Sequence, residues 1–212
     1  MDFHPLLFLG IVLFAGWMVV CGFFAFFLQE AMRKRAGEKW RTYKRLADKY
    51  GGLCDPPSLY EAGSLELPWK GTTLLLTNVS MSGDGNDTTR IEADFPDPEL
   101  ELEITTVDPL LAMAQSFGMT SRVMTGVKWF DGRFQLTTNS PKPTLGFLSP
   151  RVIETLKKIR ALRWEASLRI EIRQGQMKID LGCVLVEFEK LDLFLALATD
   201  LLMPMSKSSI KA

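Results

Sequence analysis

The chain has 212 residues, 47% of them hydrophobic, and its 25 Lys and Arg residues balance its 25 Asp and Glu residues. The only histidine is His4. Because the rest of the sequence contains none, His-dependent catalytic triads and most zinc sites are excluded. No phosphate-binding, dinucleotide-binding or nucleophile-elbow motif occurs in the sequence, and Cys21, Cys54 and Cys183 are too widely spaced for a metal or redox motif. We therefore predict no catalytic residue, no cofactor and no metal ion.

The two signs of charge are segregated along the sequence. Between Gly51 and Leu110 there are 12 acidic residues and two basic ones, Lys70 and Arg90, whereas 15 basic and nine acidic residues follow from Leu111 onward. We expect these halves to lie beside each other in the fold and to neutralise each other in part. The alternative is an acidic surface that faces a basic partner.

The first predicted element is an uncharged, proline-free run from Leu6 to Leu28. At about 1.5 Å per residue, a helix of this length crosses a hydrocarbon core about 30 Å thick. A cleaved signal peptide would need a basic leader and small residues at its cleavage site, and a buried helix of a soluble protein is the other alternative. We predict a retained membrane anchor over residues 1–28.

Basic residues follow this run and predict its orientation. Residues 29–50 contain eight bases and three acids, so the positive-inside rule places the N-terminus outside and the C-terminal domain in the cytoplasm, at the inner membrane. The same segment has apolar residues at helical spacing, which predicts a basic juxtamembrane helix. Its candidate contacts with membrane lipids or partner subunits, together with one from the span, are Trp17, Arg33, Lys34, Arg35, Trp40 and Tyr43.

Beyond Gly51 the pattern changes from helical to alternating, and residues 51–203 are predicted to form one α+β domain. The predicted antiparallel meander comprises Ser64–Leu67, Gly71–Ser80, Thr88–Phe95 and Glu99–Val107. The connector Met81–Asp87 contains acids but lacks the register of a calcium loop, so a hairpin turn is favoured.

The second half is predicted to supply the helices that cover this sheet. Asp108-Pro109 begins a short helix, and Ser149-Pro150 caps another that runs to Leu162. Gln135–Thr138 is extended, and the prolines at 141 and 143 interrupt the chain. A hairpin is predicted with its turn at Gln174-Gly175, and Gly182–Phe188 is predicted to be a last strand or an extension of the previous one. A closing helix, Leu191–Met203, follows, and residues 204–212 are predicted to be a flexible tail.

The run FDGRFQLTTNSP at 130–141, followed by Leu148-Ser149-Pro150, carries a resemblance. Over about residues 126–203 the chain resembles the C-terminal part of bacterial single-pass membrane-anchored domains of unknown function with an FDxxF element. The family brings no established activity, so the resemblance implies an architecture and no chemistry. From their residue types, Phe130 and Phe134 are expected to face inward around a turn whose amides bind Asp131.

These features predict a non-enzymatic accessory or structural subunit of a larger membrane complex, whether respiratory, photosynthetic or transport. Its partners would be lipids and other transmembrane subunits, and nucleic acid is not expected. The alternative is an autonomous anchored ligand-binding domain, or an enzyme that works without histidine.

Overall fold

The computed structural model describes residues 5–56, 63–80, 87–107, 123–139 and 141–203, with the side chains of residues 5–12, 15, 32, 35, 80, 142 and 143 excepted. The predictions for the 81–86 connector, the helix after Asp108 and the tail fall outside these residues. The chain divides into two compact units, Met1–Arg41 and Thr42–Ala212, which are described separately.

Helix α1 runs without interruption from Pro5 to Tyr50, because neither proline nor a turn signal occurs inside it. It ends where Gly51 adopts a φ of 70°, which is the left-handed conformation common after a helix C-terminus. The amide of Gly52 donates to the carbonyl of Ala47 over 2.9 Å and closes this end.

The membrane assignment requires a correction. Among the residues that the structure describes, no helix combines the length and the apolarity that crossing a membrane requires. This finding contradicts the predicted transmembrane helix over Leu6–Leu28, and the single-pass, inner-membrane localisation that depended on it is not retained.

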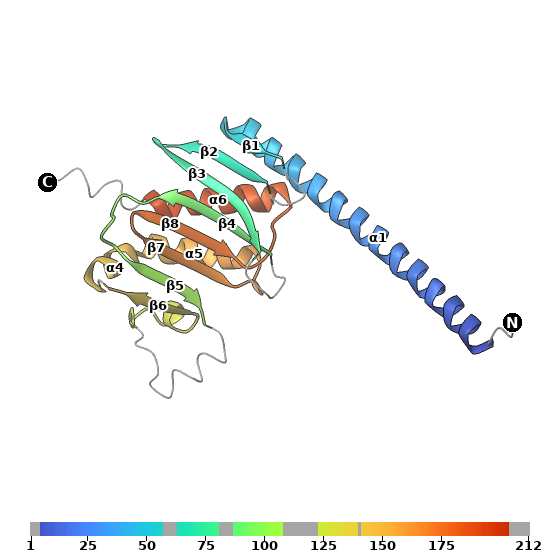
Figure 1. Ribbon diagram of the computed structural model, residues 1–212. Helices are drawn as coiled ribbons and strands as arrows, with labels where there is room; N and C mark the ends of the chain where they lie inside the picture. Colours follow the sequence, from blue (N-terminus) through green and yellow to red (C-terminus); the bar gives the residue numbers. More distant parts are fainter. Residues whose placement is uncertain (1–4, 57–62, 81–86, 108–122, 140, 204–212) are drawn as a thin grey trace. The chain divides into compact units, whose positions relative to one another are not determined.

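The second unit contains an eight-stranded antiparallel sheet in the order β1-β2-β3-β4-β8-β7-β5-β6 (Figure 1). An α+β fold with an antiparallel sheet, as predicted, is confirmed. The strands are β1 (Leu53–Asp55), β2 (Ser64–Trp69), β3 (Thr72–Ser80), β4 (Asp87–Asp94), β5 (Leu102–Thr106), β6 (Phe134–Thr138), β7 (Leu168–Arg173) and β8 (Gln176–Leu181).

One face of this sheet forms the hydrophobic core. Alternate residues of each central strand are buried, as in Leu168, Ile170 and Ile172 of β7, because successive side chains of a strand point to opposite faces. Helices α5 (Pro150–Leu162) and α6 (Phe188–Leu202) contact each other and lie against this face (Figure 1). The last turns of α1 contribute Tyr43 and Leu46 to the same core.

Local signals place α5 and the β7–β8 hairpin where the sequence predicts them. The Ser149 side chain caps α5 by accepting a hydrogen bond from the amide of Val152, and Pro150 opens its first turn, where a missing N–H costs nothing. The hairpin turns through Gln174 and Gly175, both at positive φ, which matches the twist of the flanking strands.

The predicted meander is wrong beyond its third strand. Strand β4 pairs with β8, and β5 pairs with β7 and β6, so the β7–β8 hairpin lies between β4 and β5. The alternation of apolar and polar residues within a strand does not specify which strand pairs with it. In this sheet, the β7–β8 hairpin from the C-terminal half of the chain supplies the two strands between β4 and β5.

Two further local predictions are also wrong. Residues 141–147 form helix α4 (Pro141–Phe147), because prolines are tolerated in the first turn of a helix. Residues 182–187 form no strand. Their backbone is held instead by Thr89, whose hydroxyl donates to the carbonyl of Cys183 over 2.8 Å and accepts from the amide of Leu185 over 2.9 Å.

Candidate functional site

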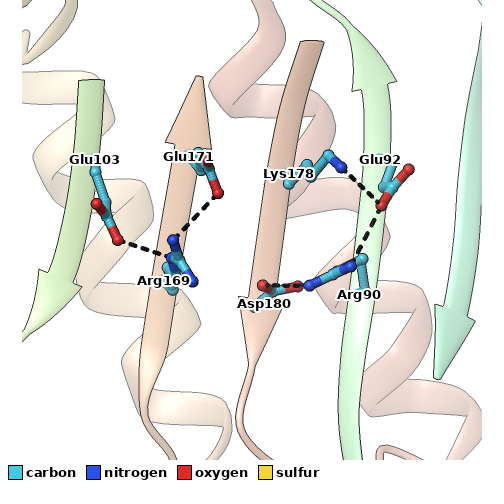
Figure 2. A network of polar contacts seen from close by, with 7 residues as sticks. All are labelled: Arg90, Glu92, Glu103, Arg169, Glu171, Lys178 and Asp180. Carbon is cyan, nitrogen blue, oxygen red and sulfur yellow. Dashed lines mark hydrogen bonds and ion pairs between the residues drawn. The ribbon is translucent and has the colours of Figure 1, made fainter. Parts of the chain in front are cut away.

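The face of the sheet opposite the core carries charged side chains from four adjacent strands (Figure 2). The register aligns them in two rows across β4, β8, β7 and β5. We call this group the charged sheet face, and it comprises Arg90, Glu92, Glu103, Arg169, Glu171, Lys178 and Asp180.

The most buried pair of the charged sheet face is Arg90 with Asp180. Arg90 Nε lies 2.6 Å from Asp180 Oδ1, and Arg90 Nη2 lies 3.0 Å from Oδ2, so the contact is bidentate. The Asp180 side chain is only 7% exposed. Hydrogen bonding to Asp180 raises the pKa of Arg90 against the opposing effect of burial, so the Arg90 guanidinium stays charged near neutral pH.

Arg169 of β7 lies between two carboxylates, Glu103 of the neighbouring strand β5 and Glu171 of its own strand. Its Nε is 2.8 Å from Glu103 Oε1, and its Nη2 is 3.3 Å from Glu171 Oε2. The Nε contact is close in distance but lacks hydrogen-bond alignment, so Arg169 acts here mainly as a charge between two acids.

These ion pairs join the acidic and basic halves of the sequence. Glu92 pairs with Lys178 at 3.6 Å, Glu101 with Arg173 at 3.9 Å, and Glu103 with Arg169. The predicted neutralisation between the halves is confirmed for these pairs. Each carboxylate of the charged sheet face has a basic neighbour, and cross-strand pairs of this kind stabilise a register, so the face is organised as a structural network.

An open depression of about 350 Å³ lies at the end of this face, beside the β7–β8 turn. It is lined by Glu171, Arg173, Gln174, Gln176 and Lys178. Its mixed charges and amides suit a polar contact, without the apolar lining that encloses most small-molecule ligands. Within the described parts of the chain, no group of three or more His, Cys, Asp or Glu residues is arranged to hold a metal ion.

The FDxxF element forms a packed turn around α3 (Lys128–Asp131). Phe130 and Phe134 are completely buried, with ring centroids 5.2 Å apart. The Asp131 carboxylate accepts hydrogen bonds from the amide and the hydroxyl of Thr125, at 3.0 and 2.8 Å, and from the amide of Gly126 at 3.0 Å. These contacts assign the three residues a structural role.

No family model, curated protein or solved structure matches this chain. The resemblance carried by the FDxxF element therefore stays a prediction.

The predicted contact residues of α1 have different environments. Trp17 is 67% exposed, and Arg33 and Lys34 are exposed, with Arg33 Nε 3.5 Å from Glu30 Oε2. Trp40 is half-buried, and Tyr43 is buried in the core of the second unit, where its hydroxyl lies 3.3 Å from Asn78 Oδ1. The side chain of Arg35 lies outside the described residues.

The apolar part of α1 is the second candidate surface. Eleven of its large side chains are each at least half exposed within the structure. We call them the apolar α1 surface, and they are Leu13, Phe14, Trp17, Met18, Val19, Val20, Phe23, Phe24, Phe26, Phe27 and Leu28.

Sequence inspection missed the charged sheet face as a unit. Arg90, Arg169 and Asp180 each alternate with buried residues, which is the signal that placed them on a polar face. The pairing of Arg90 with Asp180, however, depends on the β4–β8 register, which no local pattern specifies.

Proposed function

We propose that the protein is a non-enzymatic accessory subunit of a larger protein assembly, in which other subunits enclose the apolar α1 surface. The observation that carries the proposal is the exposure of the eleven large apolar side chains on one helix. Contiguous apolar surface of this kind marks an interaction site.

The distribution of these side chains indicates more than one neighbouring element. Successive residues of a helix are about 100° apart, so the consecutive residues Trp17 to Val20 already surround the axis of α1. A helix that is apolar on all sides is typical of a buried position, whereas one apolar stripe would fit a single groove. Enclosure contributes on the order of 2 kcal/mol for each large side chain removed from water.

The charged sheet face supports a role without catalysis. Its carboxylates are engaged by Arg90, Arg169 and Lys178, and a general base needs a carboxylate that is free to take up a proton from substrate. The face instead fixes strand register in the domain that would accompany α1 into an assembly.

Purification of the tagged full chain from its native cells tests this proposal. We expect partner polypeptides in defined stoichiometry with the unmodified chain, and their loss from a variant with Phe23→Ser, Phe24→Ser and Phe27→Ser. A matched variant changes three exposed polar residues of the same helix, Glu38→Ser, Arg41→Ser and Lys44→Ser, and is expected to keep the partners.

Two results would overturn the proposal. One is a native chain that purifies without any stoichiometric polypeptide. The other is retention of the same partners by the triple phenylalanine variant, which would show that the apolar α1 surface does not bind them.

A further inference from the structure

Among the described residues, several basic residues of the half that follows Leu111 do not take part in the ion pairs with the acidic half. Arg133, in the turn before β6, and Lys157 of α5 lie over the indole of Trp129. Lys128 precedes Trp129 in α3, and Arg160 follows Lys157 by three residues in α5, and we call this group the Trp129 surface. It comprises Lys128, Trp129, Arg133, Lys157 and Arg160.

Two of these cations lie over the same indole. The guanidinium carbon of Arg133 is 5.3 Å from the centroid of the Trp129 ring, and Lys157 Nζ is 5.4 Å from it. Trp129 is half-buried and packs against Phe134, so the ring is a fixed platform. The indole therefore holds two positive charges close together at the surface.

A third basic side chain, Arg160, follows Lys157 by three residues on α5, which places the two on the same side of the helix. Its guanidinium donates to the carbonyl of Ala166, which fixes its position. Burial lowers the pKa of Arg160, and the like charge of Arg133 lowers it further.

Little negative charge from the chain compensates this group. Lys157 contacts Glu154 at 3.2 Å. In the part of the chain that the structure describes, no ion pair links Lys128, Arg133 or Arg160 to a carboxylate. Like charges held together without counter-charges repel one another, and an anionic partner relieves that repulsion.

We propose that the Trp129 surface binds an acidic polypeptide segment of a partner subunit, which rests on the accessory-subunit function proposed above. Carboxylates of the segment would pair with Arg133, Lys157 and Arg160, since guanidinium and ammonium groups donate charge-assisted hydrogen bonds to carboxylates. Nucleic acid fits less well, because it favours an extended basic stripe, whereas this surface is short and the chain has a formal net charge of zero.

Binding of a synthetic octaglutamate peptide to the full chain, measured by isothermal titration calorimetry at low ionic strength, tests the proposal. We expect binding that weakens as salt is added, and a loss of about tenfold in affinity for the Arg133→Gln, Lys157→Gln double variant. Lys70→Gln is a matched control, because Lys70 Nζ lies 5.1 Å from the Trp69 ring in the β2–β3 turn. Its affinity is expected to stay within about twofold of the unmodified chain.

Thermal unfolding of each variant, followed by circular dichroism, verifies that the fold is retained. Three results would overturn the proposal. In the first, the unmodified chain fails to bind the peptide. In the second, the double variant binds it as tightly as the unmodified chain. In the third, Lys70→Gln loses as much affinity as the double variant. Tighter binding of oligouridylate than of octaglutamate would assign the surface to nucleic acid instead. Failure here, with stoichiometric partners still bound through α1, would remove this inference and leave the accessory-subunit proposal intact.

Discussion

At the scale of single residues, Asp131 connects the FDxxF element to the segment that precedes it. Its carboxylate accepts three hydrogen bonds from Thr125 and Gly126 and is mostly buried. Removal of the carboxylate would leave the backbone amides of Thr125 and Gly126 without their acceptor, at partly buried hydrogen bonds. Unsatisfied buried groups cost more free energy than the bond itself contributes.

We therefore expect Asp131→Ala to lower the free energy of unfolding by about 3 kcal/mol. Chemical denaturation of the full chain measures this quantity. Asp200→Ala is the control, because Asp200 forms an exposed ion pair with Arg151, and its loss should cost less than about 1 kcal/mol. Equal losses for the two variants would contradict the structural role of Asp131.

Asp192 of α6 gives a pH-dependent contribution to stability. Its carboxylate accepts hydrogen bonds from Lys49 Nζ and from the Tyr50 hydroxyl, the latter at 2.7 Å. Burial acts to raise the pKa of Asp192, but these hydrogen bonds outweigh burial, so its pKa lies below the ordinary value of 3.8. A depressed carboxyl pKa stabilises the fold above the unfolded-state pKa, and this contribution is lost as the pH falls through the folded-state pKa.

The unmodified chain should therefore be more stable than Asp192→Asn at pH 7, and this difference should shrink once the pH falls below 3.8. Denaturation midpoints of both proteins between pH 7 and about pH 2 measure the difference. A difference that persists unchanged at the acidic end would show that the charge of Asp192 is not its source.

At the scale of elements, the connection from α1 to the sheet depends on a close backbone approach. A Cβ atom at Gly52 would overlap the carbonyl oxygen of Glu66 and the side chain of Leu67 in β2. The backbone of β2 is held by its ladder to β3, so the overlap can be relieved only by displacing a paired strand.

Gly52→Ala is accordingly expected to lower the free energy of unfolding by about 2 kcal/mol. Gly146→Ala is the matched control, because Gly146 lies in α4 with open space at its Cβ position, and alanine favours a helix over glycine. Denaturation of the full-length variants measures both changes. A neutral Gly52→Ala variant would contradict the close approach of β2.

Among the elements, the β7–β8 hairpin and α5 are predicted from the sequence, whereas α4 is not. The β7–β8 hairpin follows from the alternation of Ile170 and Ile172 with Arg169 and Glu171, and α5 follows from the Ser149-Pro150 start, because these signals act within a few residues. The prolines at 141 and 143 predict an interruption of the chain, but proline also fits the first turn of a helix, and residues 141–147 form α4.

At the scale of the whole molecule, long-range pairing limits what the sequence predicts. The charge segregation indicated that the two halves neutralise each other, and pairs such as Glu103 with Arg169 carry this out. The insertion of β8 between β4 and β7 depends on contacts far apart in the chain, which neither period nor propensity encodes. The apolarity of Leu6–Leu28 predicts a membrane span, and no helix among the described residues is long and apolar enough to form one.

The central claim is that other subunits enclose the apolar α1 surface, and site-specific photo-crosslinking in native cells tests it most directly. A benzophenone amino acid at Phe24, which is exposed within the structure, is expected to form covalent adducts with discrete partner polypeptides. The same probe at Lys158, an exposed residue of α5, is the control and is expected to give no such adducts. Absence of polypeptide adducts at Phe24, or the same adducts at both positions, would contradict the account.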